Sequence, residues 1–288
     1  MDTAVTVRLR LIAQLIRLPS QTGTLLLMVP TLWALILASH GRPDPMLIAL
    51  FAFGSFLMRS AGVILNDAAD RRFDSQVERT KTRPLASGAL ALPEAAIILL
   101  VLLVCASGLL LLLNQLALRL SPVALLLAIL YPFAKRIFPL PQAVLGIAFG
   151  WGVVMAWAAA ANALAPEAWL LFAGTIAWAV AYDTIYALQD RTDDERLGIK
   201  SSAILFGENT WLAVAISFGT MAACLALAGW LSGIGVVFYG VLAACCGFVS
   251  QQAWTIRNNV SAQAAFAMFR QHVWIGWAIL AGFWIGFL

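Results

Sequence analysis

Residues 46–66 read MLIALFAFGSFLMRSAGVILN, and residues 67–78, which follow without a break, read DAADRRFDSQVE. The first stretch has the length of about 20 apolar residues that a helix needs to cross the hydrocarbon core of a bilayer. The second stretch is rich in aspartate and arginine. A spanning helix that ends in a cluster of charges predicts a membrane protein whose polar site lies at the membrane boundary.

The composition of the whole chain supports this prediction. Of its 288 residues, 62% are apolar and only 11% are charged. Soluble domains carry about 25% charged residues, so this chain has too little polar surface for a water-facing globule. The four cysteines all lie inside apolar runs and lack the spacing of metal ligands or of a disulfide framework. We therefore expect an all-α polytopic membrane protein that forms one domain over residues 1–288.

Nine apolar runs are suited to membrane-spanning helices. They occupy residues 21–39, 46–66, 94–113, 119–133, 141–162, 167–187, 211–230, 233–250 and 271–288. Pro122 and Pro132 interrupt the short fourth run, and only a few residues separate the seventh from the eighth, so eight or ten spans are alternatives. Residues 1–19 alternate arginines with apolar positions, which is typical of an amphipathic helix at the membrane surface.

The distribution of basic residues predicts the orientation. Fifteen of the eighteen Lys and Arg residues lie in the N-terminal segment or in loops on one side of the nine expected spans. Cytoplasmic loops carry an excess of Lys and Arg. We expect the N-terminus and the loops at 66–92 and 183–210 on the cytoplasmic side of the membrane, and the C-terminus on the other side.

The first acidic segment forms a regular row. Asn66, Asp70 and Asp74 recur every four residues, so they lie along one stripe of a helix. Carboxylates one turn apart repel each other unless a cation lies between them. Oxygen ligands without Cys or His favour Mg²⁺.

A second row lies about 120 residues further along the chain. Asp183, Asp190 and Asp194 are spaced by seven and four residues, which places them within about 20° of one line on a continuous helix. Two hydrophilic loops that balance their own charges are the simpler explanation. Two matching rows with flanking Lys and Arg instead predict a magnesium site for a diphosphate. Because the site opens into a bilayer, a polyprenyl diphosphate is the expected ligand.

Two ionisable residues lie deeper in the expected spans. Arg59 precedes Asn66 by seven residues and Asp183 precedes Asp190 by seven, which places each about 10 Å further into the membrane. Intramembrane charges usually pair with each other or face a cavity. The two residues form either a salt bridge between helices or a pocket for a second substrate. In that pocket Arg59 would bind a carboxylate and Asp183 a hydroxyl group.

Tyr131 and Lys135 lie one helical turn apart at the cytoplasmic end of the fourth span, next to Arg136. A Lys–Arg pair at this position is often only a topology anchor. Contact with a diphosphate is the alternative.

Four strings carry a family resemblance: NDAADRRFD at 66–74, YPFAKR at 131–136, YDTIYALQDRTDD at 182–194 and GIKS at 198–201. They resemble the intramembrane aromatic prenyltransferases of the UbiA superfamily, in the branch that acts on 4-hydroxybenzoate in ubiquinone biosynthesis. The resemblance extends over nearly the whole chain. It implies nine transmembrane helices around a central cavity, a cytoplasmic cap from the two Asp-rich loops, and a lateral opening for the prenyl tail.

The resemblance also implies a role for each matching residue. The metal ligands would be Asn66, Asp70, Asp74, Asp190 and Asp194, of which the four aspartates, with Asp183, are the catalytic carboxylates. The substrate-binding residues would be Arg59, Arg71, Tyr131, Lys135, Arg136 and Lys200. The implied reaction moves a polyprenyl group from its diphosphate to the carbon ortho to the hydroxyl of 4-hydroxybenzoate, with Mg²⁺ as cofactor.

Other functions stay open at this point. A prenyltransferase for another acceptor, such as a naphthoate or homogentisate, is the alternative within the enzyme class. A membrane transporter is the alternative from another class. Both rows lie at the same cytoplasmic face, whereas many carriers hold their substrate near the midplane, which argues against transport. Nothing in the pattern indicates nucleic acid as a partner.

Overall fold

The computed structural model describes residues 4–288, except for the side chain of residue 135. Helices and connecting turns make up the described chain, which contains no β-strand. The helices are α1 (Ala4–Leu15), α2 (Thr22–Ala38), α3 (Pro45–Asp74), α4 (Leu92–Leu110), α5 (Gln115–Ile137), α6 (Pro141–Ala161), α7 (Pro166–Ala187), α8 (Arg191–Leu197), α9 (Ser202–Phe206), α10 (Thr210–Leu231), α11 (Val236–Thr255) and α12 (Ala262–Ile285).

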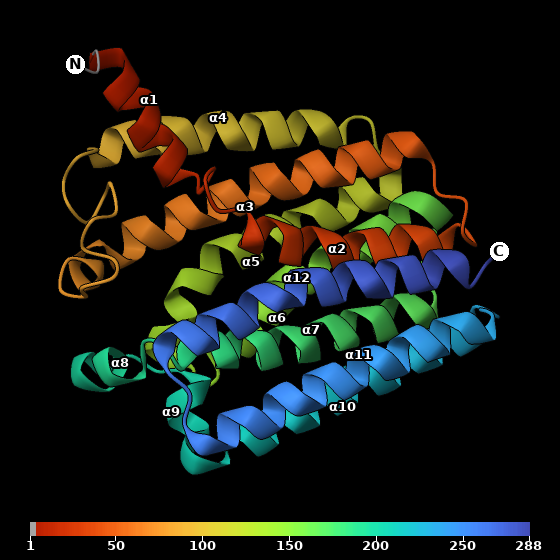
Figure 1. Cartoon of the computed structure of the whole chain (residues 1–288). Coiled ribbons are helices and arrows are strands. Elements are labelled where there is room, and N and C mark those ends of the chain that lie inside the picture. The colour runs from red at the N-terminus through yellow and green to blue at the C-terminus, as the bar shows by residue number, and fades with distance from the viewer. Residues whose placement is uncertain (1–3) are drawn as a thin grey trace.

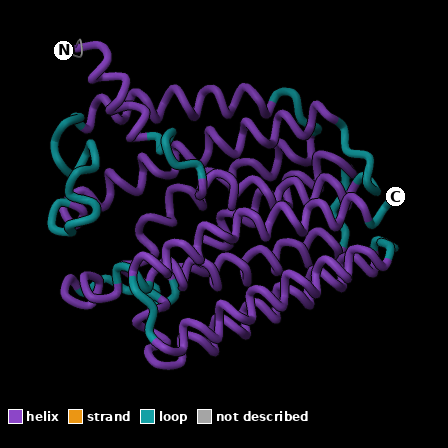
Figure 2. Tube along the Cα trace, viewed as in Figure 1, coloured by secondary structure: helices purple, strands orange, loops and turns teal. Residues whose placement is uncertain are grey.

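The long helices run side by side along one axis, and the loops gather at the two ends of the bundle (Figures 1 and 2). Among the described residues, seven helices are long and apolar enough to cross a membrane: α3, α4, α5, α6, α7, α10 extended by α9, and α11. The 17-residue helix α2 is shorter, and α12 carries polar residues in its first half. Both nevertheless pack within the same bundle, where α12 contacts α2 and α7.

Helix α5 is longer than its apolar run suggested, and both of its prolines are accommodated inside the helix. A proline has no N–H and leaves the carbonyl four residues earlier without its helical donor. For Pro122 that carbonyl belongs to Leu118, and the Ser121 hydroxyl donates a hydrogen bond to it at 2.8 Å. The side chain of the preceding residue thus replaces the bond that Pro122 removes.

The last helix begins well before the expected position at residue 271. Ser261 caps α12, because its side chain accepts a hydrogen bond from the backbone N–H of Ala264 at 3.2 Å. Serine is among the preferred residues at a helix N-cap. The helix therefore starts at Ala262, and His272 lies fully buried in its interior.

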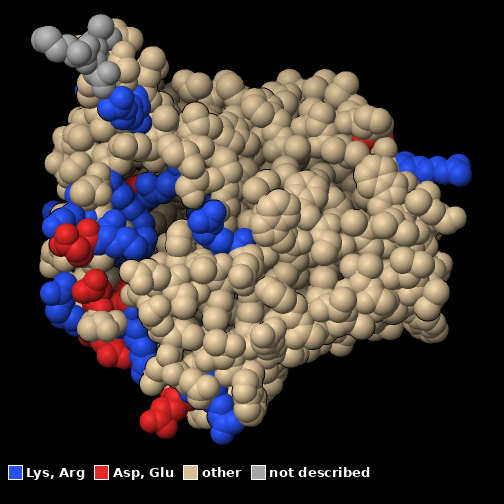
Figure 3. Space-filling model, in the orientation of Figure 1, with Lys and Arg blue, Asp and Glu red and all other residues tan. Residues whose placement is uncertain are grey.

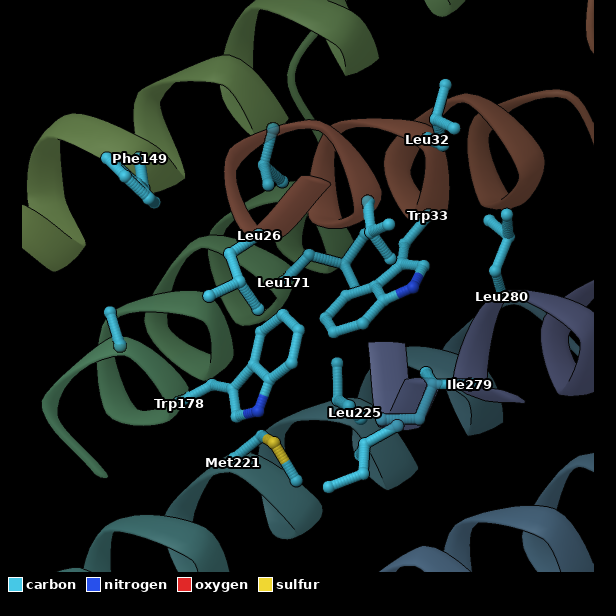
Figure 4. Close-up of a cluster of buried hydrophobic side chains, with 14 of the residues drawn as sticks. Leu26, Leu32, Trp33, Phe149, Leu171, Trp178, Met221, Leu225, Ile279 and Leu280 are labelled. Carbon is cyan, nitrogen blue, oxygen red and sulfur yellow. The ribbon is translucent and has the colours of Figure 1, made fainter. Parts of the chain in front are cut away.

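The centre of the bundle is a cluster of large aromatic and aliphatic side chains (Figure 4). The rings of Trp33 and Trp178 have centroids 5.1 Å apart, and both residues are fully buried. Trp33 donates to the backbone oxygen of Gly276, and Trp178 donates to Nδ1 of His272, each at 3.1 Å. A Cβ at Gly276 would lie 2.8 Å from the Trp178 ring, so the contact requires glycine. These bonds fix α2, α7 and α12 relative to one another.

The N-terminal helix α1 lies outside the bundle, packs on it through its last turn and forms an ion pair between Arg8 and Glu94 of α4 (Figure 1). Leu15 is fully buried in a second small core with Ile64, Leu85 and Leu90. The first residues of α1 expose their apolar side chains, Val5 and Leu9 among them. This exposure agrees with an amphipathic helix at a membrane surface. Of the segment 1–19, residues 1–3 lie outside the described part.

Candidate active site

A cavity of about 1270 Å³ enters the bundle between α2, α3, α4, α5, α6 and α7. One end is bordered by the segments that follow α3 and α7, and the other end is apolar. Most of the charged side chains visible in Figure 3 gather at the end of the molecule that carries these two segments. The cavity therefore has a polar mouth and an apolar interior.

The first row of oxygen ligands lies on the last turns of α3, as the sequence predicted. Asn66 and Asp74 border the cavity. Asp70 is only 1% exposed and does not border it, and a guanidinium nitrogen of Arg136 lies 3.6 Å from its Oδ1. The helix continues unbroken to Asp74, which keeps the row in register.

The second row is not on one continuous helix, so the geometric argument made for it from the sequence was wrong. Helix α7 ends at Ala187, and the next three residues form tight turns in which each N–H bonds to the third carbonyl back. A new helical bond, from the Asp194 N–H to the Asp190 oxygen at 2.8 Å, opens α8. Asp183, Asp190 and Asp194 all still border the cavity. The two rows thus meet at one mouth despite the break.

Arg79 joins the two acidic segments. Its guanidinium bonds both carboxylate oxygens of Asp190, at 2.9 and 2.5 Å, and the Tyr186 hydroxyl at 3.1 Å. Burial alone would lower the pKa of Arg79, but Tyr186 and the hydrogen bond to Asp190 raise it above its usual value. Arg79 is therefore a permanent positive charge at the mouth. From its position in the sequence, Arg79 was expected only among the basic residues of the cytoplasmic side.

A second cluster of charges was also missed. Arg17 bonds both carboxylate oxygens of Asp67, at 2.9 and 2.8 Å, and Arg83 bridges Asp67 and Asp74 at 3.2 and 2.8 Å. All four side chains border the cavity. Asp67 lies off the four-residue row, and Arg17 comes from the N-terminal segment, so neither belonged to a regular pattern. One feature of the sequence could have indicated this cluster: Asp67 lies next to the row at the end of an apolar span, and a buried aspartate needs a basic partner.

Arg59 and Asp183 both border the cavity, below its polar mouth. In the described part of the chain they form no ion pair within 4 Å, so the salt bridge considered as an alternative is not formed. The guanidinium of Arg59 instead lies against α2, where a Cβ on Gly23 would come within 2.6 Å of its Nε. Tyr131 and Tyr182 border the same region of the cavity.

Lys200 borders the cavity as expected, and its ammonium group donates to the Ile137 oxygen at the end of α5 at 2.9 Å. This bond attaches the segment after α8 to the C-terminus of α5. Lys135 belongs to α5 by its backbone, but its side chain lies outside the described part of the structure.

Two other basic residues from the sequence prediction lie behind the cavity wall. Arg71 donates to the Leu85 oxygen at 3.0 Å, and Arg136 donates to the Ala69 oxygen at 2.6 Å. Arg136 also lies over the Phe73 ring, with 5.6 Å to the ring centroid. Neither arginine borders the cavity. In this structure they hold the loop after α3 and the end of α5 in place.

The donor set at the mouth suits Mg²⁺, because it consists of carboxylate and amide oxygens. No three His, Cys, Asp or Glu side chains of residues 4–288 lie close enough to enclose an ion by themselves. Mg²⁺ is commonly bound by one or two carboxylates together with water and substrate phosphates. The residues therefore fit an ion that is held jointly with a diphosphate.

Fold and site together define a helical membrane protein whose cavity suits a molecule with an anionic head and an apolar body. The sequence pattern of the UbiA prenyltransferase family matches residues 27–286. The chain belongs to this family, as the four strings had predicted.

Relatives and solved structures agree with this assignment. A protein of Tolumonas auensis described as 4-hydroxybenzoate octaprenyltransferase is 46% identical over 270 residues, which cover 93% of this chain and 94% of the relative. Its counterpart in Cupriavidus metallidurans is 45% identical and covers 98% and 95%. The apo structure of a UbiA homologue from Aeropyrum pernix K1 has 27% identity and a TM-score of 0.76, covering 92% of this chain and 98% of the homologue.

A more distant structure shares the fold alone. The UbiA homologue from Archaeoglobus fulgidus, solved with GPP and Mg²⁺, is 14% identical, with a TM-score of 0.69 over 94% of this chain and 99% of that one.

Proposed function

We propose that this protein transfers a polyprenyl group from polyprenyl diphosphate to 4-hydroxybenzoate, as a step of ubiquinone biosynthesis. The products are 3-polyprenyl-4-hydroxybenzoate and diphosphate. The observation that carries this proposal is identity of about 45% to 4-hydroxybenzoate octaprenyltransferases over nearly the full length. The polar mouth and apolar interior of the cavity fit both ends of a polyprenyl diphosphate.

The mouth would bind the diphosphate. Asn66, Asp70, Asp74, Asp190 and Asp194 are the proposed ligands of Mg²⁺, which when bound supplies positive charge to the leaving diphosphate. Charged donors that are already in place stabilise a developing anion without reorganising. Arg79, Arg83 and Lys200 line this end of the cavity and would contribute such donors. Lys135 and Tyr131 of α5 are further proposed contacts of the diphosphate. Arg71 and Arg136 would support them from behind the wall.

Loss of the diphosphate breaks the allylic C–O bond, and the electron pair leaves with the diphosphate oxygen. The ring carbon ortho to the hydroxyl of 4-hydroxybenzoate then forms the new C–C bond. The ring proton leaves to a carboxylate at the site or to the released diphosphate. The apolar walls keep water away from the allyl cation.

Arg59 and Asp183 would hold the acceptor. A planar guanidinium can bind the carboxylate of 4-hydroxybenzoate through two parallel bonds. Asp183 would accept a hydrogen bond from the ring hydroxyl at the other end of the molecule. The absence of a close ion pair between these two described side chains supports this arrangement, since both face the cavity.

We further propose nine membrane spans, in which α2 and α12 join the seven long apolar helices. The start of α1 and the C-terminus lie at opposite ends of the bundle, which supports an odd number of crossings (Figure 1). The excess of Lys and Arg at the mouth supports our proposal that this end faces the cytoplasm, in the inner membrane of a bacterium.

The test uses purified protein in detergent with octaprenyl diphosphate and 4-hydroxybenzoate, with and without a chelator. We expect a prenylated product that carries the acceptor carboxylate and that disappears when the chelator is added. Parallel reactions with a naphthoate and with homogentisate test the acceptor. Product with one of these and none with 4-hydroxybenzoate would overturn the proposal.

A further inference from the structure

Helix α3 presents a stripe of residues toward α4. Leu50, Gly54 and Met58 follow one another at four-residue spacing, and all three border the cavity. A Cβ built on Gly54 would lie 3.8 Å from Cδ1 of Leu109, which is ordinary van der Waals contact. At Gly54, α3 and α4 therefore lie side by side at the cavity wall, and a side chain added there would extend into the space next to Leu109.

The acceptor side of the cavity lies elsewhere on the same helix. Arg59 is five residues after Gly54, which corresponds to about 140° around the helix axis at 100° per residue. Its guanidinium contacts Gly23 of α2. Helix α3 therefore faces two parts of one cavity, one toward α2 and one toward α4.

The two parts differ in chemistry. The α4 side is lined by Leu103, Ala106, Ser107, Leu109, Leu110 and Leu113. None of these side chains is ionisable, whereas the part of the cavity next to α2 contains the guanidinium of Arg59 from α3. A hydrocarbon suits the first environment and a carboxylate the second.

We propose that the prenyl tail of the donor lies between α3 and α4, and that Gly54 determines how long a tail the cavity accepts. This inference rests on the proposed prenyl transfer and names its specificity-determining residue. A side chain larger than glycine at position 54 would fill the space next to Leu109 and stop a tail that must pass this point.

The distance along α3 sets the expected limit. Gly54 precedes Asn66 by twelve residues, so it lies about 18 Å below the metal-binding row. Each isoprene unit adds four carbon–carbon bonds of about 1.5 Å, or roughly 5 Å in an extended chain. Tails of two or three units end before Gly54, and a tail of eight units must pass it.

The experiment compares geranyl, farnesyl and octaprenyl diphosphates with the Gly54→Leu variant. We expect turnover of octaprenyl diphosphate to fall about 10- to 100-fold, as for an overpacked site, with geranyl and farnesyl turnover unchanged. Gly108→Leu is the matched control, because Gly108 lies on α4, does not border the cavity and has no neighbour within 4 Å. This control should handle all three donors like the wild type.

A second substitution tests the contact itself. Leu109→Ala in the Gly54→Leu background should restore octaprenyl turnover, because it removes the atom nearest to the added side chain. Unchanged octaprenyl turnover in Gly54→Leu would overturn the inference. An equal loss of turnover with all three donors, in a variant that melts like the wild type, would also overturn it. Failure of the wild type with every donor would instead overturn the proposed function.

Discussion

Replacement of Asp67 by Asn should loosen the N-terminal segment from the bundle. Asp67 is 2% exposed and accepts two bonds from Arg17 and one from Arg83. Removal of one partner of a buried ion pair costs about 3–5 kcal/mol. The side chains of Arg17 and Arg83 are 28% and 19% exposed, so water can solvate both after the change. Asn also keeps one acceptor oxygen, and we expect a loss of about 2–3 kcal/mol.

The loss can be measured by thermal unfolding of the purified protein and by limited trypsin digestion. A destabilisation of this size should lower the melting temperature by roughly 5–10 °C. Cleavage after Arg17 should accelerate, because the tie between this residue and α3 is broken.

Glu195→Gln is a matched control. This substitution breaks the ion pair in which Arg191 Nε lies 3.0 Å from Glu195 Oε1. Both side chains of this pair are well exposed. Such surface pairs contribute at most about 1 kcal/mol. A double-mutant cycle with Arg17→Gln then isolates the coupling to Asp67. If Asp67→Asn melts like Glu195→Gln and is cut no faster at Arg17, the ion pair does not hold the segment and the reasoning fails.

Three further outcomes are expected. Asp70→Asn and Asp190→Asn should each lower turnover about 100- to 1,000-fold at normal membrane insertion, because each loses a ligand for the ion that stabilises the leaving group; near-wild-type turnover would remove the assignment. Arg59→Lys should raise the KM for 4-hydroxybenzoate about tenfold without changing that for the donor, since lysine cannot make the planar two-point contact; an unchanged KM for 4-hydroxybenzoate would argue against the acceptor site. EDTA should abolish turnover, and added Mg²⁺ should restore it; activity that persists in EDTA would contradict the magnesium site.

The helices could be predicted because the bilayer imposes one strong requirement, a long apolar run. Hydropathy alone could not place the ends of these helices. The early start of α5 coincides with the Asn114 cap, which accepts a bond from the Ala117 N–H at 3.0 Å, and the early start of α12 coincides with the Ser261 cap. Both are single hydrogen bonds of polar side chains near the helix ends.

At the site, helical spacing correctly predicted the positions of the row on α3. It did not predict the positions of the second row. Asn66 and Asp74 lie on an unbroken helix, so their spacing translates directly into position. Neither Gly nor Pro marks the break after Ala187. The pairing of Arg79 with Asp190 joins residues 111 positions apart, and a tertiary contact of this kind leaves no periodic trace in one sequence.

The two faces of α3 bear on how enzymes of this kind can change their substrates. Gly54 and Arg59 lie on the same helix and face different parts of one cavity. A substitution toward α4 alters the room for the tail without touching the groups that hold the ring, and a substitution toward α2 does the reverse. Donor length and acceptor choice are therefore separable traits, and an engineer could combine a new tail preference with a new aromatic acceptor by editing each side independently.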